Sequence, residues 1–224
     1  MTATFFIPTF YTMLNFKTFI FNPFQVNTYV IHDTETSEGI IVDPGNSRNK
    51  ENRNLSSFIE ANDISITKVV ITHGHIDHVF GLNYASENFT TDIYFPSPDY
   101  PLLEHLEKQS EMVGMTINKI EKPKFDLHTF EELILGNYKI DIRKVPGHSP
   151  GGTILVFHSE RKLLTGDTIF FESVGRSDLY GGDFQELKNS ISSQILSLPD
   201  DYEILPGHGP LTTVGHEKQH NPFL

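Results

Sequence analysis

The chain has 224 residues, a length that suits one large domain or two small ones and can bury a sizeable core. Charged residues make up 21% and hydrophobic residues 38%, a balance typical of globular rather than disordered chains. The net charge of −12 argues against a nucleic-acid backbone or an anionic membrane as the main partner. Because the chain has no cysteine, a disulfide framework and thiolate metal ligands are excluded.

The N-terminus bears on where the folded domain begins. No apolar run approaches the roughly 20 residues that span a bilayer. The opening stretch MTATFFIPTFYT has neither the basic segment nor the small-residue cleavage site of a signal peptide. We therefore expect a cytoplasmic protein in which residues 1–12 form an extension, either an upstream start or a disordered arm, and residues 13–224 form a single domain.

The first half of the chain alternates predicted strands with predicted helices. Strands are indicated by β-branched and aromatic runs at residues 14–21, 26–33, 38–42 and 66–72. Apolar residues recur at helical spacing in residues 51–61, 77–89 and 97–112. Residues 113–126 show neither the helical nor the strand pattern, which predicts a long exposed loop.

The second half repeats this alternation. Strands are predicted within residues 132–145, 153–158, 161–167 and 202–208. Asp183 and Glu186 form a capping-box pattern at the start of a helix that continues through Leu187, Ile191 and Ile195. Because both halves run strands and then helices, the sequence predicts an α/β protein with two similar halves.

Four of these apolar runs end in a histidine or an aspartate. VVIT leads into His73 and His75, and IDIRKV leads into His148. KLLT leads into Asp167, and YEIL leads into His208. In α/β proteins, functional residues collect in the loops just beyond the strand ends. We therefore expect these loops to meet at one site.

The residue types in these loops suit metal ions. His73 and His75 lie two apart on an extended stretch, so both can face one ion and His148 can complete a three-histidine face. Asp77 and His78 begin the next helix, point elsewhere, and make a second face with His208. Asp167 could bridge the two faces. Histidine and carboxylate ligands without thiolate suit zinc, iron or manganese.

The remaining histidines and one aspartate give weaker signals. His216 and His220 are four residues apart in a predicted C-terminal helix, which suits either zinc or a solvated helix face, and the second fits better. His32, His105, His128 and His158 are predicted to lie on the surface. Asp43, in VDPG, is predicted to be a buried residue that either forms a turn or orients the metal loop.

The four motifs together resemble the metallo-β-lactamase superfamily across residues 14–224. They are THGHIDH at 72–78, PGHS at 146–149, TGD at 165–167 and PGHG at 206–209. The resemblance implies a four-layer αβ/βα sandwich with the metal site at one edge, between two similar halves. It also implies that His73, His75 and His148 bind one metal, that Asp77, His78 and His208 bind the second, and that Asp167 bridges them.

Within the superfamily, residues 166–183 and the stretch from 206 onward are similar to short glyoxalase II-like hydrolases. This resemblance implies that Arg176 binds the glycyl carboxylate of glutathione, although Asp178 stands where that branch has a tyrosine. Arg176 could equally pair with Asp178. Tyr180, Met112 and Met115 either contact the substrate or pack within the protein.

The resemblance implies hydrolysis of a small-molecule thioester, such as an S-2-hydroxyacylglutathione, by a hydroxide that bridges two divalent ions, zinc for preference and iron or manganese as alternatives. Asp77 and Asp167 are the expected catalytic carboxylates. One alternative is a persulfide dioxygenase with a single iron on His73, His148 and Asp167. Another is a lactonase or other small-ester hydrolase.

Overall fold

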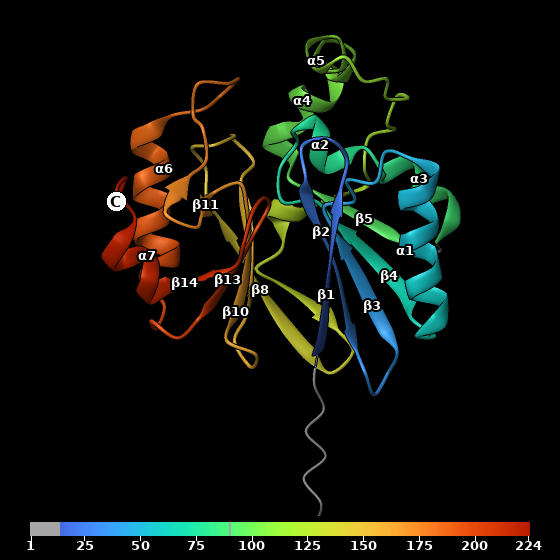
Figure 1. Ribbon diagram of the computed structural model, residues 1–224, viewed down its shortest axis with the longest axis horizontal. Helices are drawn as coiled ribbons and strands as arrows, with labels where there is room; N and C mark the ends of the chain where they lie inside the picture. The colour runs from blue at the N-terminus through green and yellow to red at the C-terminus, as the bar shows by residue number, and fades with distance from the viewer. Residues whose placement is uncertain (1–13, 90) are drawn as a thin grey trace, which may run out of the picture.

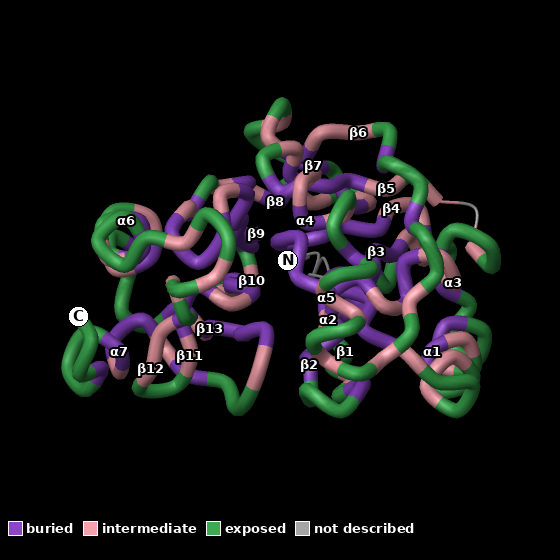
Figure 2. The backbone as a smooth tube through the Cα atoms, turned by 90° about the horizontal axis from the view of Figure 1, so that it is seen from above, coloured by how far each residue is buried: buried purple, intermediate pink, exposed green. Residues whose placement is uncertain are grey.

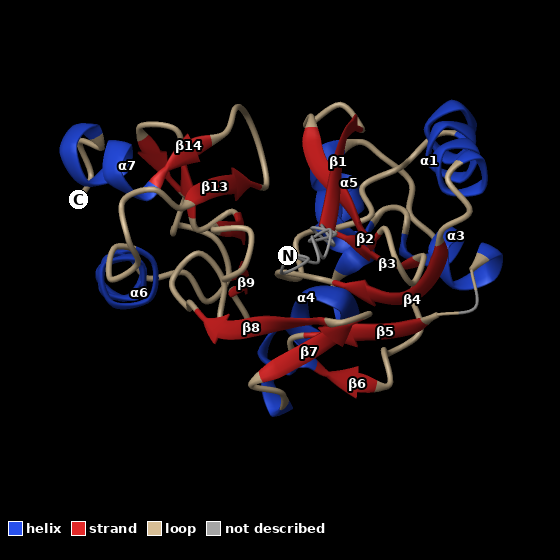
Figure 3. Cartoon of the chain, turned by 90° about the horizontal axis from the view of Figure 1, so that it is seen from below, coloured by secondary structure: helices blue, strands red, loops and turns tan. Residues whose placement is uncertain are grey.

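Two six-stranded sheets lie face to face in the computed structural model, with helices on their outer sides (Figure 1). The structure describes residues 14–89 and 91–224, so the predicted extension at residues 1–12 lies outside the described residues. Figure 3 shows α1 and α3 beyond one sheet and α6 and α7 beyond the other. The predicted four-layer αβ/βα sandwich with two similar halves is confirmed.

The first half builds one sheet in simple sequence order. Its strands are β1 (Leu14–Phe21), β2 (Val26–Asp33), β3 (Glu38–Val42), β4 (Ser65–Val70), β5 (Asp92–Phe95) and β6 (Phe125–Asp126). The first three strands are antiparallel, and β3 to β6 run parallel. The helices are α1 (Asn49–Ala61), α2 (Ile76–Val79), α3 (Leu82–Asn88), α4 (Tyr100–Glu104) and α5 (Leu106–Val113).

The second half builds the other sheet. Its strand order is β14 (Thr212–Thr213), β13 (Glu203–Pro206), β10 (Lys162–Gly166), β9 (Thr153–Phe157), β8 (Tyr138–Lys144) and β7 (Glu132–Leu135). Only β10 and β13 run parallel, so their carboxyl ends lie side by side. A small hairpin of β11 (Ile169–Phe170) and β12 (Ser173–Val174) follows β10, and the helices are α6 (Phe184–Ser190) and α7 (Val214–His220).

Three apolar cores separate the four layers. Strand β9 shows why, because it is buried along its whole length: Ile154 and Val156 pack toward α6, whereas Leu155 and Phe157 pack between the sheets. Successive side chains of a strand point to opposite faces, so an unbroken apolar strand fills two cores. Figure 2 shows these buried strands in the interior, with exposed residues along the outer helices.

Three local predictions need correction. His32 is only 6% exposed rather than on the surface, because β2 is buried on both faces and the imidazole packs beside Phe58. The loop predicted at residues 113–126 is shorter than predicted, because Val113 ends α5 and Phe125–Asp126 form β6, and it buries Ile120 and Pro123. The helix capped by Asp183 changes at Ile191 into a π-helical turn, Ile191–Ile195, which keeps its apolar side chains in the core.

Among residues 14–89 and 91–224, no helix has both the length and the apolar character that a membrane crossing requires.

Candidate metal centre

The four loops that follow β4, β8, β10 and β13 meet at one point between the halves. They bring together five histidines and two aspartates whose candidate ligand atoms fall into three groups, each within 4.8 Å. Those seven side chains are the seven predicted from the sequence: His73, His75, Asp77, His78, His148, Asp167 and His208. The predicted convergence of the strand ends is therefore confirmed.

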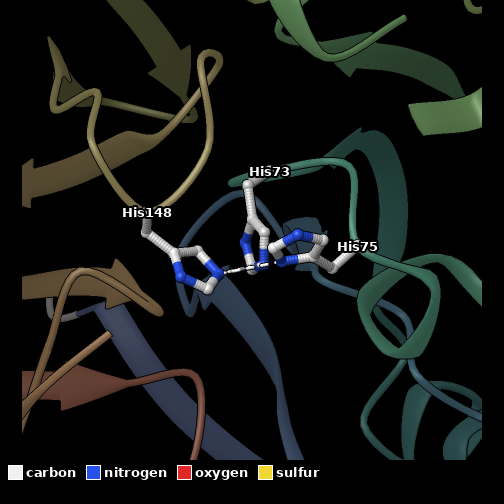
Figure 4. A group of neighbouring side chains, drawn as sticks. All are labelled: His73, His75 and His148. Carbon is white, nitrogen blue, oxygen red and sulfur yellow. Dashed lines mark hydrogen bonds between the residues drawn. The ribbon is translucent and has the colours of Figure 1, made fainter. Parts of the chain in front are cut away.

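Three imidazoles form one face of the cluster (Figure 4). The Nδ1 atom of His75 lies 2.9 Å from Nε2 of His148, and that atom lies 3.2 Å from Nε2 of His73. All three side chains are buried, with exposed fractions of 8% or less. Their nitrogen atoms converge on one position, the arrangement that a tetrahedral metal ion needs from three protein ligands.

A second face lies beside the first. Nε2 of His208 is 3.1 Å from Oδ2 of Asp77, and Nε2 of His78 is 3.8 Å from the same oxygen. Asp167 stands between the faces, with Oδ1 3.3 Å from His78 and Oδ2 3.8 Å from His148. The expectation that His78 points away from the first face is only partly met, because its ring centroid is 4.1 Å from that of His73.

Asp43 holds the loop that carries three of these histidines. Its Oδ1 accepts a hydrogen bond from the backbone N–H of Thr72 at 2.8 Å. Its Oδ2 accepts one from the Thr72 hydroxyl at 2.7 Å and one from Nδ1 of His78 at 2.9 Å. Asp43 is 2% exposed, which confirms the predicted buried residue that orients the metal loop.

Backbone carbonyls orient two further histidines. Nδ1 of His148 donates to the carbonyl oxygen of Arg176 at 2.7 Å, and Nδ1 of His208 donates to that of Phe24 at 3.0 Å. A carbonyl can only accept, so each Nδ1 carries the proton and each Nε2 keeps a free lone pair facing the cluster. This is the usual way in which a protein fixes the tautomer of a metal-binding histidine.

Asp99 also holds two of these loops, and sequence reasoning missed it. Its side chain is fully buried and accepts hydrogen bonds from Gly74 N–H at 2.8 Å, the Ser149 hydroxyl at 2.8 Å and Gly151 N–H at 2.6 Å. It thus ties the loop of His73 and His75 to the loop of His148. The available signal was its position in SPD just after β5, at the same end of the sheet as the other loops.

Burial dominates the electrostatics of the first face. It lowers the pKa of His73 well below the usual value, helped by the charges of His78, His148 and His75. Burial and the charge of His148 also lower the pKa of His75 to about 3. These imidazoles are therefore neutral at pH 7, the form that binds metal.

The second face has the opposite character. Burial opposes the charged form of His78, but the carboxylates of Asp167, Asp77 and Asp43 outweigh it and raise the pKa of His78 well above its usual value. The pKa of His208 is also raised, since Asp77 and Asp167 outweigh its burial. Burial opposes the charge of Asp167, yet His78 and its neighbours hold that carboxyl pKa well below the usual range.

The donor set fits a pair of divalent cations. Buried polar atoms normally have hydrogen-bond partners, but Nε2 of His78 and Oδ1 of Asp167, which face the cluster, make no well-formed hydrogen bond within the described chain. Five imidazoles and two carboxylates share this small volume. Lone pairs aimed at a common centre, without hydrogen-bond donors to meet them, are what a metal site offers.

The other histidines do not join this cluster. His216 lies on α7, as expected for the C-terminal helix, and its Nε2 is 3.1 Å from Glu172. Its ring is 4.6 Å from that of the exposed His220. His105 and His158 lie on the surface as predicted, whereas His128 is half-buried and hydrogen-bonded to Thr153 at 2.9 Å.

Comparison with known proteins identifies the family. Residues 21–208 match the family model described as the metallo-beta-lactamase superfamily. The chain belongs to that superfamily. The match spans all four loops of the cluster, so the superfamily membership inferred from the motifs is confirmed.

Three superfamily members illustrate the similarity. The chain is 35% identical to the hydroxyacylglutathione hydrolase GloC of Haemophilus influenzae over 90% of this chain and 93% of that protein. The crystal structure of BLEG-1 B3 metallo-beta-lactamase is 32% identical, with a TM-score of 0.85 over 93% of this chain and 99% of that one. The chain is also similar to the crystal structure of TTHA1623 in a di-iron-bound form. The sequence identity is 31%, and the TM-score is 0.82 over 93% of this chain and 100% of that one.

A cavity of about 720 Å³ opens onto the cluster of histidine and aspartate side chains. Five of the seven cluster residues line it: His75, Asp77, His148, Asp167 and His208. Arg176 and Tyr180, the predicted substrate contacts, line it too, as does Met112. Arg176 also pairs with Asp178, with Nε and one terminal nitrogen 2.7 and 2.8 Å from the two carboxylate oxygens.

Proposed function

We propose that the protein is a metal-dependent hydrolase that cleaves a small-molecule thioester, such as an S-2-hydroxyacylglutathione. The observation that carries this proposal is the position of the cluster, since five of its seven candidate ligands line a cavity of about 720 Å³. A purely structural metal site is closed, whereas a catalytic one keeps a side open to substrate.

The proposed roles follow the two faces of the cluster. His73, His75 and His148 hold one ion. Asp77, His78 and His208 hold the other, and Asp167 is shared by both. Two bound divalent ions supply a nucleophilic water at neutral pH and polarise a substrate carbonyl. We assign zinc to both positions, with iron or manganese as alternatives, because the ligands are imidazole and carboxylate without thiolate.

The chain's own residues prepare the site for this chemistry. Three hydrogen-bond acceptors each keep one nitrogen of a histidine directed at the cluster. Asp43 orients His78, the carbonyl of Arg176 orients His148, and the carbonyl of Phe24 orients His208. Ile76, Leu102 and Phe170 line the cavity and give it an apolar wall beside the cluster. A thiolate leaves readily because a free thiol has a pKa of roughly 8.5, so no strong general acid is needed.

The names of two relatives support this proposal. One is a hydroxyacylglutathione hydrolase, which acts on the proposed class of substrate, and a solved relative is a di-iron-bound form. The second supports a two-metal site and makes iron the first alternative to zinc.

The proposal is tested with the metal-loaded protein and S-lactoylglutathione, whose hydrolysis is followed by thiol release. We expect turnover, and we expect Asp167→Asn to lower kcat/KM by about a hundredfold or more because it weakens both metal sites at once. Asp92→Asn, a change at an exposed position on β5, is the matched control and should keep full activity. Full turnover by Asp167→Asn would disprove the proposed role of that carboxylate.

The alternatives draw on the same cluster, with only His73, His148 and Asp167 used by a persulfide dioxygenase, and they are separated by their products. A persulfide dioxygenase consumes oxygen with glutathione persulfide, a lactonase opens a lactone, and the similarity to BLEG-1 adds a β-lactam as a substrate to assay. Oxygen uptake without thioester hydrolysis would replace the present proposal with the first of these.

A further inference from the structure

The rim of the cavity is unusually apolar for an exposed surface. Met112, Tyr180 and Phe24 all line it, with exposed fractions of 73%, 60% and 40%. They come from both halves of the molecule, since Met112 lies on α5 and Tyr180 lies between β12 and α6. Large exposed apolar side chains gathered around one opening mark a surface that binds a ligand. The ligand therefore has an apolar part that reaches the rim.

Two cations line the same cavity, and one is already neutralised. Arg176 makes a two-point contact with Asp178, in the geometry with which a guanidinium binds a carboxylate. That contact lowers the pKa of Asp178 to about 2, so the carboxylate stays ionised at neutral pH. A substrate carboxylate would have to displace Asp178 to reach Arg176.

Lys108 is the other cation, and it is free. It lines the cavity from α5, and within the described chain its ammonium group makes no ion pair or hydrogen bond. Its helix neighbours Glu107 and Glu111 do not line the cavity. Gln109, the next residue, holds α5 in place: its side chain accepts from Ile76 N–H at 3.2 Å and donates to the Leu102 carbonyl at 2.8 Å.

From these contacts we infer a substrate class for the proposed hydrolase that differs from a glutathione thioester, which carries two carboxylates: a thioester with an apolar tail and one anionic group that pairs with Lys108. Asp178 removes Arg176 as a second anion-binding position. The inference rests on the proposed function for the thioester itself, but the apolar tail and the single anion follow from the cavity wall.

Binding measurements test this without turnover. The ligands are a short series of alkyl thioethers, which cannot be hydrolysed, that differ in the spacer between sulfur and a carboxylate, each with its uncharged amide counterpart. Calorimetry on the metal-loaded protein gives the ratio of the two Kd values for each pair. We expect the best acid to bind about fivefold more tightly than its amide, the upper range for an exposed charge pair.

Three variants locate that preference. Lys108→Gln should reduce the ratio to about one, whereas Lys119→Gln, a change at a lysine that is 84% exposed beside Glu121 and outside this cavity, should keep it. Asp178→Asn should raise the ratio about threefold by freeing Arg176. An unchanged ratio in Lys108→Gln, or no rise in Asp178→Asn, would overturn the inference.

The matching thioesters keep this result separate from the proposed function. If the Kd ratios change as expected but no thioester is hydrolysed, the substrate-binding inference stands and the proposed reaction fails. If thioesters are hydrolysed but Lys108→Gln keeps the acid preference, the reaction stands and the inference fails.

Discussion

The two faces of the histidine and aspartate cluster differ most sharply in the pKa values of their histidines. The pKa of His73 and that of His75 are lowered by burial, whereas the pKa of His78 and that of His208 are raised by neighbouring carboxylates. A metal ion binds only the neutral imidazole, so protons compete with the metal far more strongly at the second face.

This difference predicts which ion leaves first on acidification. In a pH series from 7.5 to 5.5, we expect the second face to lose its ion first, because His78 and His208 bind protons more readily than His73 and His75 do. Dialysis at steps across this range, followed by elemental analysis, should show the metal content falling from two ions per chain to one. Simultaneous loss of both ions would contradict the assignment of these residues to separate faces.

Asp99 should matter for stability as well as for metal binding. Asp99→Ala leaves two backbone N–H groups and a hydroxyl without their buried acceptor, so we expect the free energy of unfolding to fall by about 3 kcal/mol. Urea unfolding measures this change. Asp92→Ala, a change at an exposed aspartate seven residues earlier, should stay within about 0.5 kcal/mol of the unchanged protein. Equal effects of the two substitutions would show that Asp99 does not hold the loops.

Residues with a strong local pattern could be predicted from the sequence, and their partners could not. His73, His75 and Asp77 stand in one motif, and Asp43 stands in a turn after an apolar strand. Asp99 carries no pattern of its own, because its role depends on Gly74 and on a loop 50 residues further along the chain. Burial of His32 likewise depends on packing against α1, which no local pattern shows.

At the scale of elements, the alternation of strands and helices was readable because each apolar run has a clear period. The change from α6 to a π-helical turn could not be predicted from the sequence. An α-helix and a π-helical turn both keep Leu187, Ile191 and Ile195 on one side. The free cation on α5 could not be recognised either, because only the three-dimensional structure shows that Lys108 lines the cavity without an ionic partner. The pairing of Arg176 with Asp178 was one of the two predicted alternatives.

Gly147 shows how closely the metal loops pack against the elements around them. Its φ angle is +128°, and a Cβ atom there would lie 2.2 Å from the backbone nitrogen of Leu187 in α6. Asp183 N–H also donates to the Gly147 carbonyl at 2.8 Å, so α6 begins directly against the loop of His148.

Gly147→Ala should therefore displace this loop from α6. We expect the free energy of unfolding to fall by about 2 kcal/mol or more, with weaker metal binding, because backbone strain and a backbone clash add together. Gly114→Ala is the matched control, since Gly114 has a φ of +65° but open space around its Cβ position, and it should cost about 1 kcal/mol. A smaller loss in Gly147→Ala than in Gly114→Ala would contradict this account.

At the scale of the whole molecule, the two sheets serve one site. Each half supplies loops from the carboxyl ends of its strands, and β2 joins the halves where Asn27 N–H donates to the Gly207 carbonyl at 2.7 Å. The Asn27 side chain also donates to the carbonyls of Pro206 and Gly209, both at 3.0 Å. The resemblance to a known family was needed to predict this assembly, since strand order and the facing of the two sheets leave no periodic signal in the chain.

The most direct test of the central claim is the metal content per chain, measured by elemental analysis on protein purified without added metal and again after reconstitution. The account predicts two divalent ions per chain, and one ion or fewer in a variant that combines His78→Ala with His208→Ala. A single iron per chain would favour oxygen chemistry on a persulfide. No metal in either preparation would contradict the metal centre itself.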